Sequence, residues 1–368
     1  MRGSTVRVAT TRSRREPGGR AAAAALLLIF CAVASTRAAS TPAASSQSGG
    51  ALDDMQRREG EALLRLTDEA MSGRAASDFS IAWSNDFFKA QTGTFVPFTL
   101  TIARSAMTAP AALMYIRAAR RNALPAASTV SYPFDIVFSV PLEASAGQPI
   151  RITRGFAVAP GEYDVYVALR ERASNPRRSD RRLKCAVIKQ PLSVPDFWTG
   201  QLAMSTVMLA DRIDRVPAPV SGDDVLERPY VIGASEVHKA IGTSFRHDRE
   251  LIVVFLIYNP TVSTEKRFDV EVSYHLFRRN AGATDVDADR DHPAAEPGEA
   301  YVTRTPPQRF QPELMGPDFD PVSGPILAGQ GILLSSFEAG EYRLGITVTD
   351  RLSRQALTRN VVFKVVGS

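Results

Sequence analysis

The sequence predicts an all-β protein with two tandem immunoglobulin-like or fibronectin-like β-sandwich domains, preceded by a signal peptide and one short amphipathic helix. Two observations carry this prediction. From residue 78 onward, short apolar runs alternate with polar residues at period two, between turns rich in glycine, proline, asparagine and serine. In addition, the phrase APGEYDVYVALRER at 159–172 returns as AGEYRLGITVTDRL at 339–352. Gly161 and Gly340 are 179 residues apart, about the length of one domain with its linker.

The first sandwich is predicted at residues 78–195. Its strands are expected at 79–83, 95–102, 112–117, 134–140, 150–158, 162–171 and 183–188. Seven short antiparallel strands in this length are typical of an immunoglobulin-like sandwich. The apolar residues of the repeated phrase alternate with polar ones and are predicted to point into the core, namely Tyr163, Val165, Val167 and Leu169.

The second sandwich is predicted at residues 198–368. Its strands are expected at 202–209, 229–232, 251–258, 268–277, 301–304, 332–337, 341–350 and 360–366. The inward positions of its copy of the phrase are Tyr342, Leu344, Ile346 and Val348. The repeat therefore predicts one device that closes each domain: a turn glycine, a tyrosine that enters the core, and a strand that pairs with the terminal one. Prolines in 190–196 predict a stiff connection between the domains.

The first 38 residues have the pattern of a secretory signal peptide. Arginines precede an unbroken apolar run of 14 residues at 21–34, which ends near small residues. A membrane span wants about 20 apolar residues, so we expect cleavage after Ala38, with an uncleaved anchor as the alternative. Residues 39–50 are rich in small polar residues and are predicted to be a disordered linker.

An amphipathic helix is predicted at residues 51–74. Its apolar stripe consists of Leu52, Met55, Leu63, Leu66 and Met71. We expect this stripe to pack against the first domain, because an apolar helix face is usually buried by its own protein.

Charge excludes nucleic acid as a partner. The chain has a net charge of +5, but residues 1–38 contain seven arginines and one glutamate, so the rest carries about −1. A near-neutral protein has no electrostatic attraction for DNA or RNA.

Cys185 is the only cysteine after residue 38, so no disulfide within the mature chain is expected. We expect a periplasmic or secreted protein with no membrane span after cleavage.

The acidic segment DVDADRDHPAAE at 285–296 is the best candidate for a metal site. Asp285, Asp287, Asp289 and Glu296 have the spacing of the oxygen ligands at positions 1, 3, 5 and 12 of an EF-hand. The position that requires glycine is Arg290, however, and strands flank the segment. We interpret it as a solvated hairpin tip, with weakly bound calcium as the alternative; no other cofactor is expected.

Basic residues gather around the last hairpin of the first domain, where they are a candidate site for an anionic partner. They are Arg170, Arg172, Arg177, Arg178, Arg181, Arg182 and Lys184. The alternative is a soluble tip that prevents edge-to-edge pairing of sheets.

Trp198 lies at the predicted domain boundary and is interpreted as an interdomain contact, with a sugar-stacking platform as its alternative.

No motif for catalysis is found. The four histidines do not stand in a compact metal-ligand spacing, and no nucleophile elbow or phosphate-binding glycine loop occurs. The segment His247-Asp248-Arg249-Glu250 is interpreted as a charged loop before a buried strand rather than as an acid/base group. We therefore expect that the protein is not an enzyme.

Three phrases carry a resemblance to a known family: PGEYDVYVALRER, LSVPDF with LAMSTVMLADRI, and GEYRLGITVTDRLSRQALTRNVVFKV. Together they resemble the β-rich regions of bacterial secreted proteins related to von Willebrand factor A. The resemblance covers most of residues 78–368 and implies an exported β-sandwich protein of the cell envelope. The metal motif of the A domain itself, Asp-x-Ser-x-Ser, has its nearest match at Asp78, Ser80 and Ala82, where alanine replaces the second serine. The metal-binding A domain is therefore not expected in this chain.

These observations favour a non-enzymatic exported protein of the bacterial cell envelope, which binds or scaffolds through the loops and edges of its sandwiches. Its partner is expected to be a protein or a polysaccharide of the envelope. The alternatives are an enzyme or accessory domain that acts on envelope polymers, and a weak calcium-dependent adhesion module.

Overall fold

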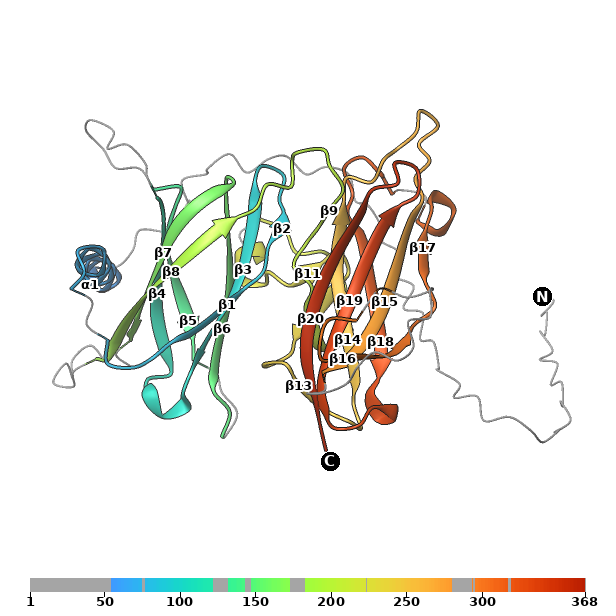
Figure 1. The fold of residues 1–368 in the computed structure, drawn as a ribbon. Helices are drawn as coiled ribbons and strands as arrows, with labels where there is room; N and C mark the ends of the chain where they lie inside the picture. Colours follow the sequence, from blue (N-terminus) through green and yellow to red (C-terminus); the bar gives the residue numbers. More distant parts are fainter. Residues whose placement is uncertain are drawn as a thin grey trace, which may run out of the picture.

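The computed structural model describes residues 54–74, 77–121, 132–142, 147–172, 183–222, 224–279, 293, 295–316 and 319–367, and of residues 54–59 only the backbone. The predicted signal peptide and linker lie outside these ranges. Within the ranges, neither helix combines the length and the apolar content that crossing a bilayer requires. The prediction of an all-β protein made of sandwiches is confirmed: strands form four sheets, and Figure 1 shows them as two sandwiches side by side.

The strands of the first sandwich are β1 (Ala82–Asn85), β2 (Phe88–Lys89), β3 (Thr94–Ile102), β4 (Ala111–Arg120), β5 (Phe134–Pro141), β6 (Ile150–Val158), β7 (Gly161–Glu171) and β8 (Cys185–Val194). They form two 4-stranded sheets that pack against each other. One has the order β1-β3-β2, with β6 also paired to β3, and the other has the order β5-β4-β7-β8. A 3₁₀ turn, Arg104–Ala106, follows β3.

The second sandwich pairs a 6-stranded sheet, with the order β11-β12-β10-β14-β18 and with β9 beside β14, with another, with the order β13-β20-β19-β15-β16 and with β17 beside β15. The first of these sheets contains β9 (Ala203–Met204), β10 (Met208–Arg215), β11 (Val231–Ile232), β12 (Ser235–Lys239), β14 (Glu250–Tyr258) and β18 (Ile326–Leu333). The second contains β13 (Ser244–Arg246), β15 (Val270–Arg279), β16 (Glu299–Arg304), β17 (Gln308–Phe310), β19 (Gly340–Asp350) and β20 (Ala356–Val366). A short helix, α2 (Asp224–Glu227), and 3₁₀ turns at Pro312–Leu314 and Leu334–Ser336 connect strands.

Several predicted strands needed correction. The strand expected at 332–337 is β18, Ile326–Leu333, which ends in a 3₁₀ turn. Its glycines read as turn residues, but a Cβ at Gly329 would lie 3.1 Å from the carbonyl oxygen of Val253 on the neighbouring strand, so glycine permits this close approach. The strand expected at 202–209 is divided into β9 and β10. Strand β8 continues through Pro191 to Val194, so the connection between the domains is shorter than 190–196.

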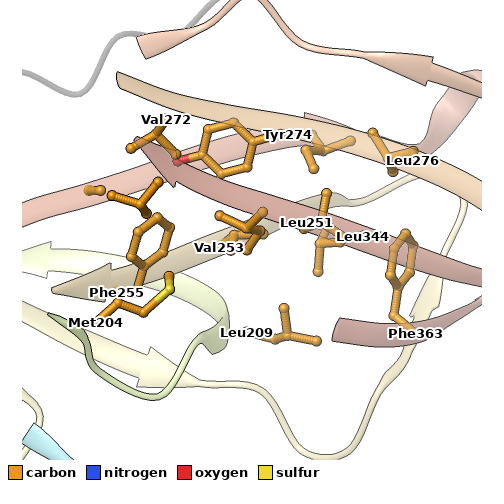
Figure 2. Close-up of a cluster of buried hydrophobic side chains, with 14 of the residues drawn as sticks. Met204, Leu209, Leu251, Val253, Phe255, Val272, Tyr274, Leu276, Leu344 and Phe363 are labelled. Carbon is orange, nitrogen blue, oxygen red and sulfur yellow. The ribbon is translucent and has the colours of Figure 1, made fainter. Parts of the chain in front are cut away.

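Each sandwich has its own apolar core. In the second sandwich, Figure 2 shows Val253 and Phe255 of β14 opposite Val272 and Tyr274 of β15. The inward positions predicted for the two copies of the phrase are all buried in the two cores, as expected from period two. They are Tyr163, Val165, Val167 and Leu169 in the first and Tyr342, Leu344, Ile346 and Val348 in the second.

The repeated phrase forms a tyrosine corner in each domain. The Tyr163 hydroxyl donates to the carbonyl oxygen of Ala159 at 2.9 Å, and the Tyr342 hydroxyl donates to that of Glu338 at 2.8 Å. Both tyrosines therefore bond four residues back while their rings lie in the core. Because this device fixes the turn that leads into β7 and β19, it explains why the same short phrase occurs twice.

Each copy of the phrase also ends on a buried carboxylate that holds loops. Glu171 accepts hydrogen bonds from the backbone N–H groups of Thr108 at 2.6 Å and Lys184 at 3.1 Å. At the equivalent position, Asp350 accepts from Thr261 at 2.7 Å and Leu352 at 2.9 Å. Burial acts to raise the pKa of both carboxyls. The hydrogen bonds from Thr108 and Lys184 to Glu171, and from Thr261 and Ser353 to Asp350, outweigh it, so the pKa of each is lowered.

Acid is therefore expected to destabilise both domains through these two carboxyls. A lowered folded-state pKa contributes stability above the unfolded values, 4.5 for Glu171 and 3.8 for Asp350, and this contribution is lost as the pH falls through the folded values. Urea unfolding from about pH 6 to about pH 3 should show the loss. Glu171→Gln and Asp350→Asn should each reduce the pH dependence; an unchanged dependence in both would contradict this account.

The predicted amphipathic helix is present as α1 (Asp54–Met71), which covers the outer face of the β4–β7–β8 sheet (Figure 1). Leu63 is fully buried there, and it packs in a cluster with Leu113, Tyr115, Ala168 and Val187. Arg117 of β4 ties the helix down, since its Nη1 lies 2.7 Å from Asp68 Oδ1.

The equivalent face of the second domain is polar. The strand registers place Glu271, Ser273, Thr347 and Thr358 where the first domain has Leu113, Tyr115, Ala168 and Val187. A polar face is stable in water, so the second domain does not need a covering helix there. This difference explains why the chain supplies a helix to one repeat.

Candidate functional site

Most of the acidic segment proposed for calcium lies outside the described residues. Asp285, Asp287 and Asp289 belong to this part, and their ligand role stays a prediction. Glu296 is described, and its Oε1 lies 3.6 Å from Nε of Arg343. The neighbour of this carboxylate is therefore a cationic side chain, not another carboxylate. In the part of the chain that the structure describes, no three side chains of histidine, cysteine, aspartate or glutamate group closely enough to hold a metal ion.

Arg343 is itself fixed by a buried ion pair on β16. Its Nη2 lies 2.6 Å from Oε2 of Glu299, and both side chains are buried. Its guanidinium also stacks 4.1 Å from the centre of the Phe277 ring. Burial acts to raise the pKa of Glu299, but Arg343 outweighs it, and the pKa is lowered. The ion pair between Glu299 and Arg343 therefore links β16 to β19, which is a structural role.

The basic hairpin of the first domain is described only at its base. Arg170, Arg172 and Lys184 are described, whereas Arg177, Arg178, Arg181 and Arg182 lie outside the described residues. Lys184 Nζ donates to the carbonyl oxygen of Ala106 at 2.6 Å, and Arg172 Nη1 donates to Ser139 Oγ at 3.2 Å. These two cations hold neighbouring segments, Arg170 lies on β7, and the role of the basic residues in binding an anionic partner stays a prediction.

Three histidines lie in the described part of the chain and fall on separate elements, whereas His292 lies outside it. His238 lies on β12 with its Nε2 2.9 Å from Asp214 Oδ2, His247 follows β13, and His275 lies on β15. Asp248, in the segment considered as an acid/base group, is held by Arg246 at 2.8 Å. This hydrogen bond lowers the pKa of Asp248, as suits a surface ion pair. The interpretation of a charged loop therefore agrees with the geometry.

A third apolar cluster joins the two sandwiches. It contains Phe88 of the first domain, Phe197 of the connection and, from the second domain, Met208, Ala210, Tyr230, Val237, Val254, Leu256 and Tyr258, with Phe95 packed against it. The facing sheets are thus β3–β2 with β6 and β14–β10–β12, which form the two middle layers of the molecule (Figure 1). A Cβ on Gly155 of β6 would lie 2.4 Å from the Phe95 ring of β3 and 3.1 Å from Cβ of Pro229, so glycine leaves room for that ring and for the second domain.

A buried polar network lies in this junction. Asp86, only 1% exposed, accepts hydrogen bonds at Oδ2 from the Tyr230 hydroxyl at 2.7 Å and from Lys239 Nζ at 2.6 Å. The carboxylate belongs to the first domain and both donors belong to the second. Burial and then the nearby Asp86 raise the pKa of Tyr230, so it stays a donor. A buried carboxylate of one domain that accepts from two donors of the other favours one relative orientation of the two domains.

Further hydrogen bonds link the two domains beside β2. Thr206 exchanges hydrogen bonds with the backbone of Phe87, through its Oγ1 at 2.9 Å and its own N–H at 3.2 Å. Lys89 Nζ donates to Asn259 Oδ1 at 2.7 Å and lies 4.2 Å from the centre of the Trp198 ring. Trp198 Nε1 in turn donates to the carbonyl oxygen of Gly93 at 3.1 Å. Trp198 is 51% exposed, and these contacts make it an interdomain contact, as interpreted from the sequence.

Sequence reasoning missed the Asp86 network, although one signal for the junction was available. The run LIVVFLIY at 251–258 has no alternation, which is typical of a strand buried on both faces. In β14, Val253, Phe255 and Ile257 lie in the domain core, and Val254 and Leu256 lie in the junction. No signal marked Asp86, because SNDFFK reads as an ordinary turn.

No family model matches the chain, and no curated protein matches it. Among solved structures, it is similar to Salmonella alpha-2-macroglobulin reacted with methylamine, with 12% identity, 79% of this chain and 17% of that chain covered, and a TM-score of 0.20. It is also similar to fibronectin(III)-like modules of Clostridium thermocellum CbhA, with 9% identity, 78% and 95% covered, and a TM-score of 0.18. A third similar structure is Bacteroides uniformis beta-glucuronidase 2, with 9% identity, 74% of this chain and 26% of that chain covered, and a TM-score of 0.22. The chain thus spans about a sixth of the macroglobulin and a quarter of the glucuronidase.

Proposed function

We propose that the chain is an exported, non-enzymatic protein of the bacterial cell envelope that binds or scaffolds other envelope components. In this proposal the two sandwiches act as one rigid body. The observation that supports it best is the junction, where an apolar cluster and the Asp86 network hold the domains in one orientation. A fixed pair of sandwiches is suited to holding partners at a set distance.

Three further observations support export and a structural role. The arginine-rich start with its apolar run of 14 residues is typical of a signal peptide. The resemblance to secreted proteins related to von Willebrand factor A agrees with that compartment. The carboxylates Glu171 and Asp350 and the ion pair Arg343–Glu299 are committed to holding loops and strands, which suits a structural role.

Cell fractionation tests the proposal. The protein is expected outside the cytosol, with a mature N-terminus near Ala39, and Leu28→Asp in the apolar run should retain it inside because a charge interrupts the run. A matched Leu28→Ile change should leave export intact. An intact Met1 end recovered from the cytosol would contradict export, and crosslinking in the native cell that recovers no envelope component would contradict binding.

A further inference from the structure

Among the residues that the structure describes, none pairs with the outer edge of β20 along most of its length. On one side, β20 pairs with β19 from Ala356 to Val365. On the other side, β13 pairs with it only at Lys364–Val366. The N–H of Lys364 donates to the carbonyl oxygen of Thr243 at 2.7 Å, so alternate residues of β20 direct their backbone groups toward this side. The same alternation directs the N–H and C=O groups of Thr358, Asn360 and Val362 toward the open edge.

These three residues are exposed. Among the described residues, one bond reaches their outward backbone groups: the Arg359 guanidinium donates to the carbonyl oxygen of Thr358 at 3.3 Å. A row of unpaired backbone donors and acceptors is a template for another strand, which proteins normally block.

The first domain blocks the equivalent edge. The backbone of Cys185 bonds with Asp78, through Oδ2 at 2.9 Å and the Asp78 N–H at 2.8 Å. The N–H of Val187 donates to Ser77 Oγ at 3.1 Å. Further along β8, Pro191 has no N–H to offer a partner. The edge of β8 in the first domain is therefore blocked, whereas the equivalent edge of β20 in the second domain is open.

The strand registers align the two edges residue by residue. Val187 pairs with Ala168, and Thr358 pairs with Thr347, at equivalent positions of the repeat. Four residues on from each, Pro191 in the first domain corresponds to Val362 in the second. The first domain thus contains proline where the second has an N–H free to bond.

The charge of the open edge indicates what would pair with it. The segment RQALTRNVVFK at 354–364 contains Arg354, Arg359 and Lys364 and no acidic residue. We propose that the β20 edge binds an extended, acidic segment of a partner protein, which adds to the sheet as a further strand. The stretch from Ala356 to β13 has room for a strand of about eight residues. This proposal deepens the binding function proposed above and rests on it.

A peptide of eight residues that alternates valine and glutamate is the probe, and calorimetric titration of the mature chain is the measurement. Wild type is expected to bind it, and Val362→Pro and Thr358→Pro should each weaken binding about tenfold, because each removes an outward N–H. Val362→Ala and Thr358→Ala keep that N–H and should bind within about threefold of wild type. Proline with its nitrogen facing solvent is tolerated on an edge strand, so both variants should fold, as circular dichroism checks.

Two peptides keep the test independent of the variants. The same peptide with N-methylated backbone amides, and one with lysine in place of glutamate, should each bind wild type at least about tenfold more weakly. Equal binding of either peptide, equal binding by the proline variants, or no binding of the acidic peptide would overturn the proposal. A dimer of wild type in sedimentation that Val362→Pro abolishes would also overturn it, since a second copy would then occupy the edge. Failure here leaves fractionation and native crosslinking as separate tests of the proposed function.

Discussion

Asp86→Ala is expected to lower the free energy of unfolding by about 3 to 5 kcal/mol, as breaking a buried ion pair does. The change leaves Lys239 Nζ and the Tyr230 hydroxyl without the acceptor that they share in the junction. Urea unfolding measures the loss. The domains should also separate more readily, because the network spans the junction.

Two controls distinguish the buried network from charge alone. Asp248→Ala removes an exposed ion pair with Arg246, which solvent screens, and should change stability much less than Asp86→Ala does. Adding Lys239→Met to Asp86→Ala should restore part of the loss, since no unpaired, partly buried ammonium remains. An Asp86→Ala effect no larger than that of Asp248→Ala would contradict the importance of the network.

Tyr163→Ala and Tyr342→Ala are each expected to destabilise their own domain by about 3 to 5 kcal/mol, as truncation of a buried aromatic does. Each tyrosine fills a core and also donates to a backbone carbonyl oxygen four residues back. Calorimetric unfolding of the variants measures the effect.

The matched phenylalanine variants separate packing from hydrogen bonding in the two corners. Tyr163→Phe and Tyr342→Phe keep the ring and lose only the hydroxyl, so each should cost about 1 kcal/mol. If the phenylalanine variants lost as much stability as the alanine variants, the hydrogen bond rather than the buried ring would be the main contribution. Unequal effects at Tyr163 and Tyr342 would mean that the two corners are not equivalent.

Local pattern predicted the repeated parts of the fold well. Period two, turn residues and the tyrosine phrase are properties of short segments, and they gave the inward residues of β7 and β19 correctly. Strand β18 was misplaced because its glycines read as a turn, although they permit close approach to β14. Short strands such as β13 were missed, since three residues contain too little pattern to recognise.

The junction was beyond sequence reasoning for a different reason. Asp86, Tyr230 and Lys239 come from segments far apart in the chain, and only the packing of two complete sheets brings them together. The open edge of β20 also depends on tertiary structure. Ser77 and Asp78 close the edge of β8, whereas β13 covers only the end of β20. Neither contact follows from the spacing of residue types.

The distance between the two domains tests the central claim, that the sandwiches form one rigid body. Val137 on β5 and Val302 on β16 are exposed at 41% and 43%, on the outer sheets of the two domains. Spin labels at Val137→Cys and Val302→Cys, with Cys185→Ala, allow this distance to be measured by pulsed electron spin resonance. The account predicts one narrow distance distribution that broadens when Asp86→Ala is added. A broad distribution without Asp86→Ala would show two domains that move independently, and would contradict it.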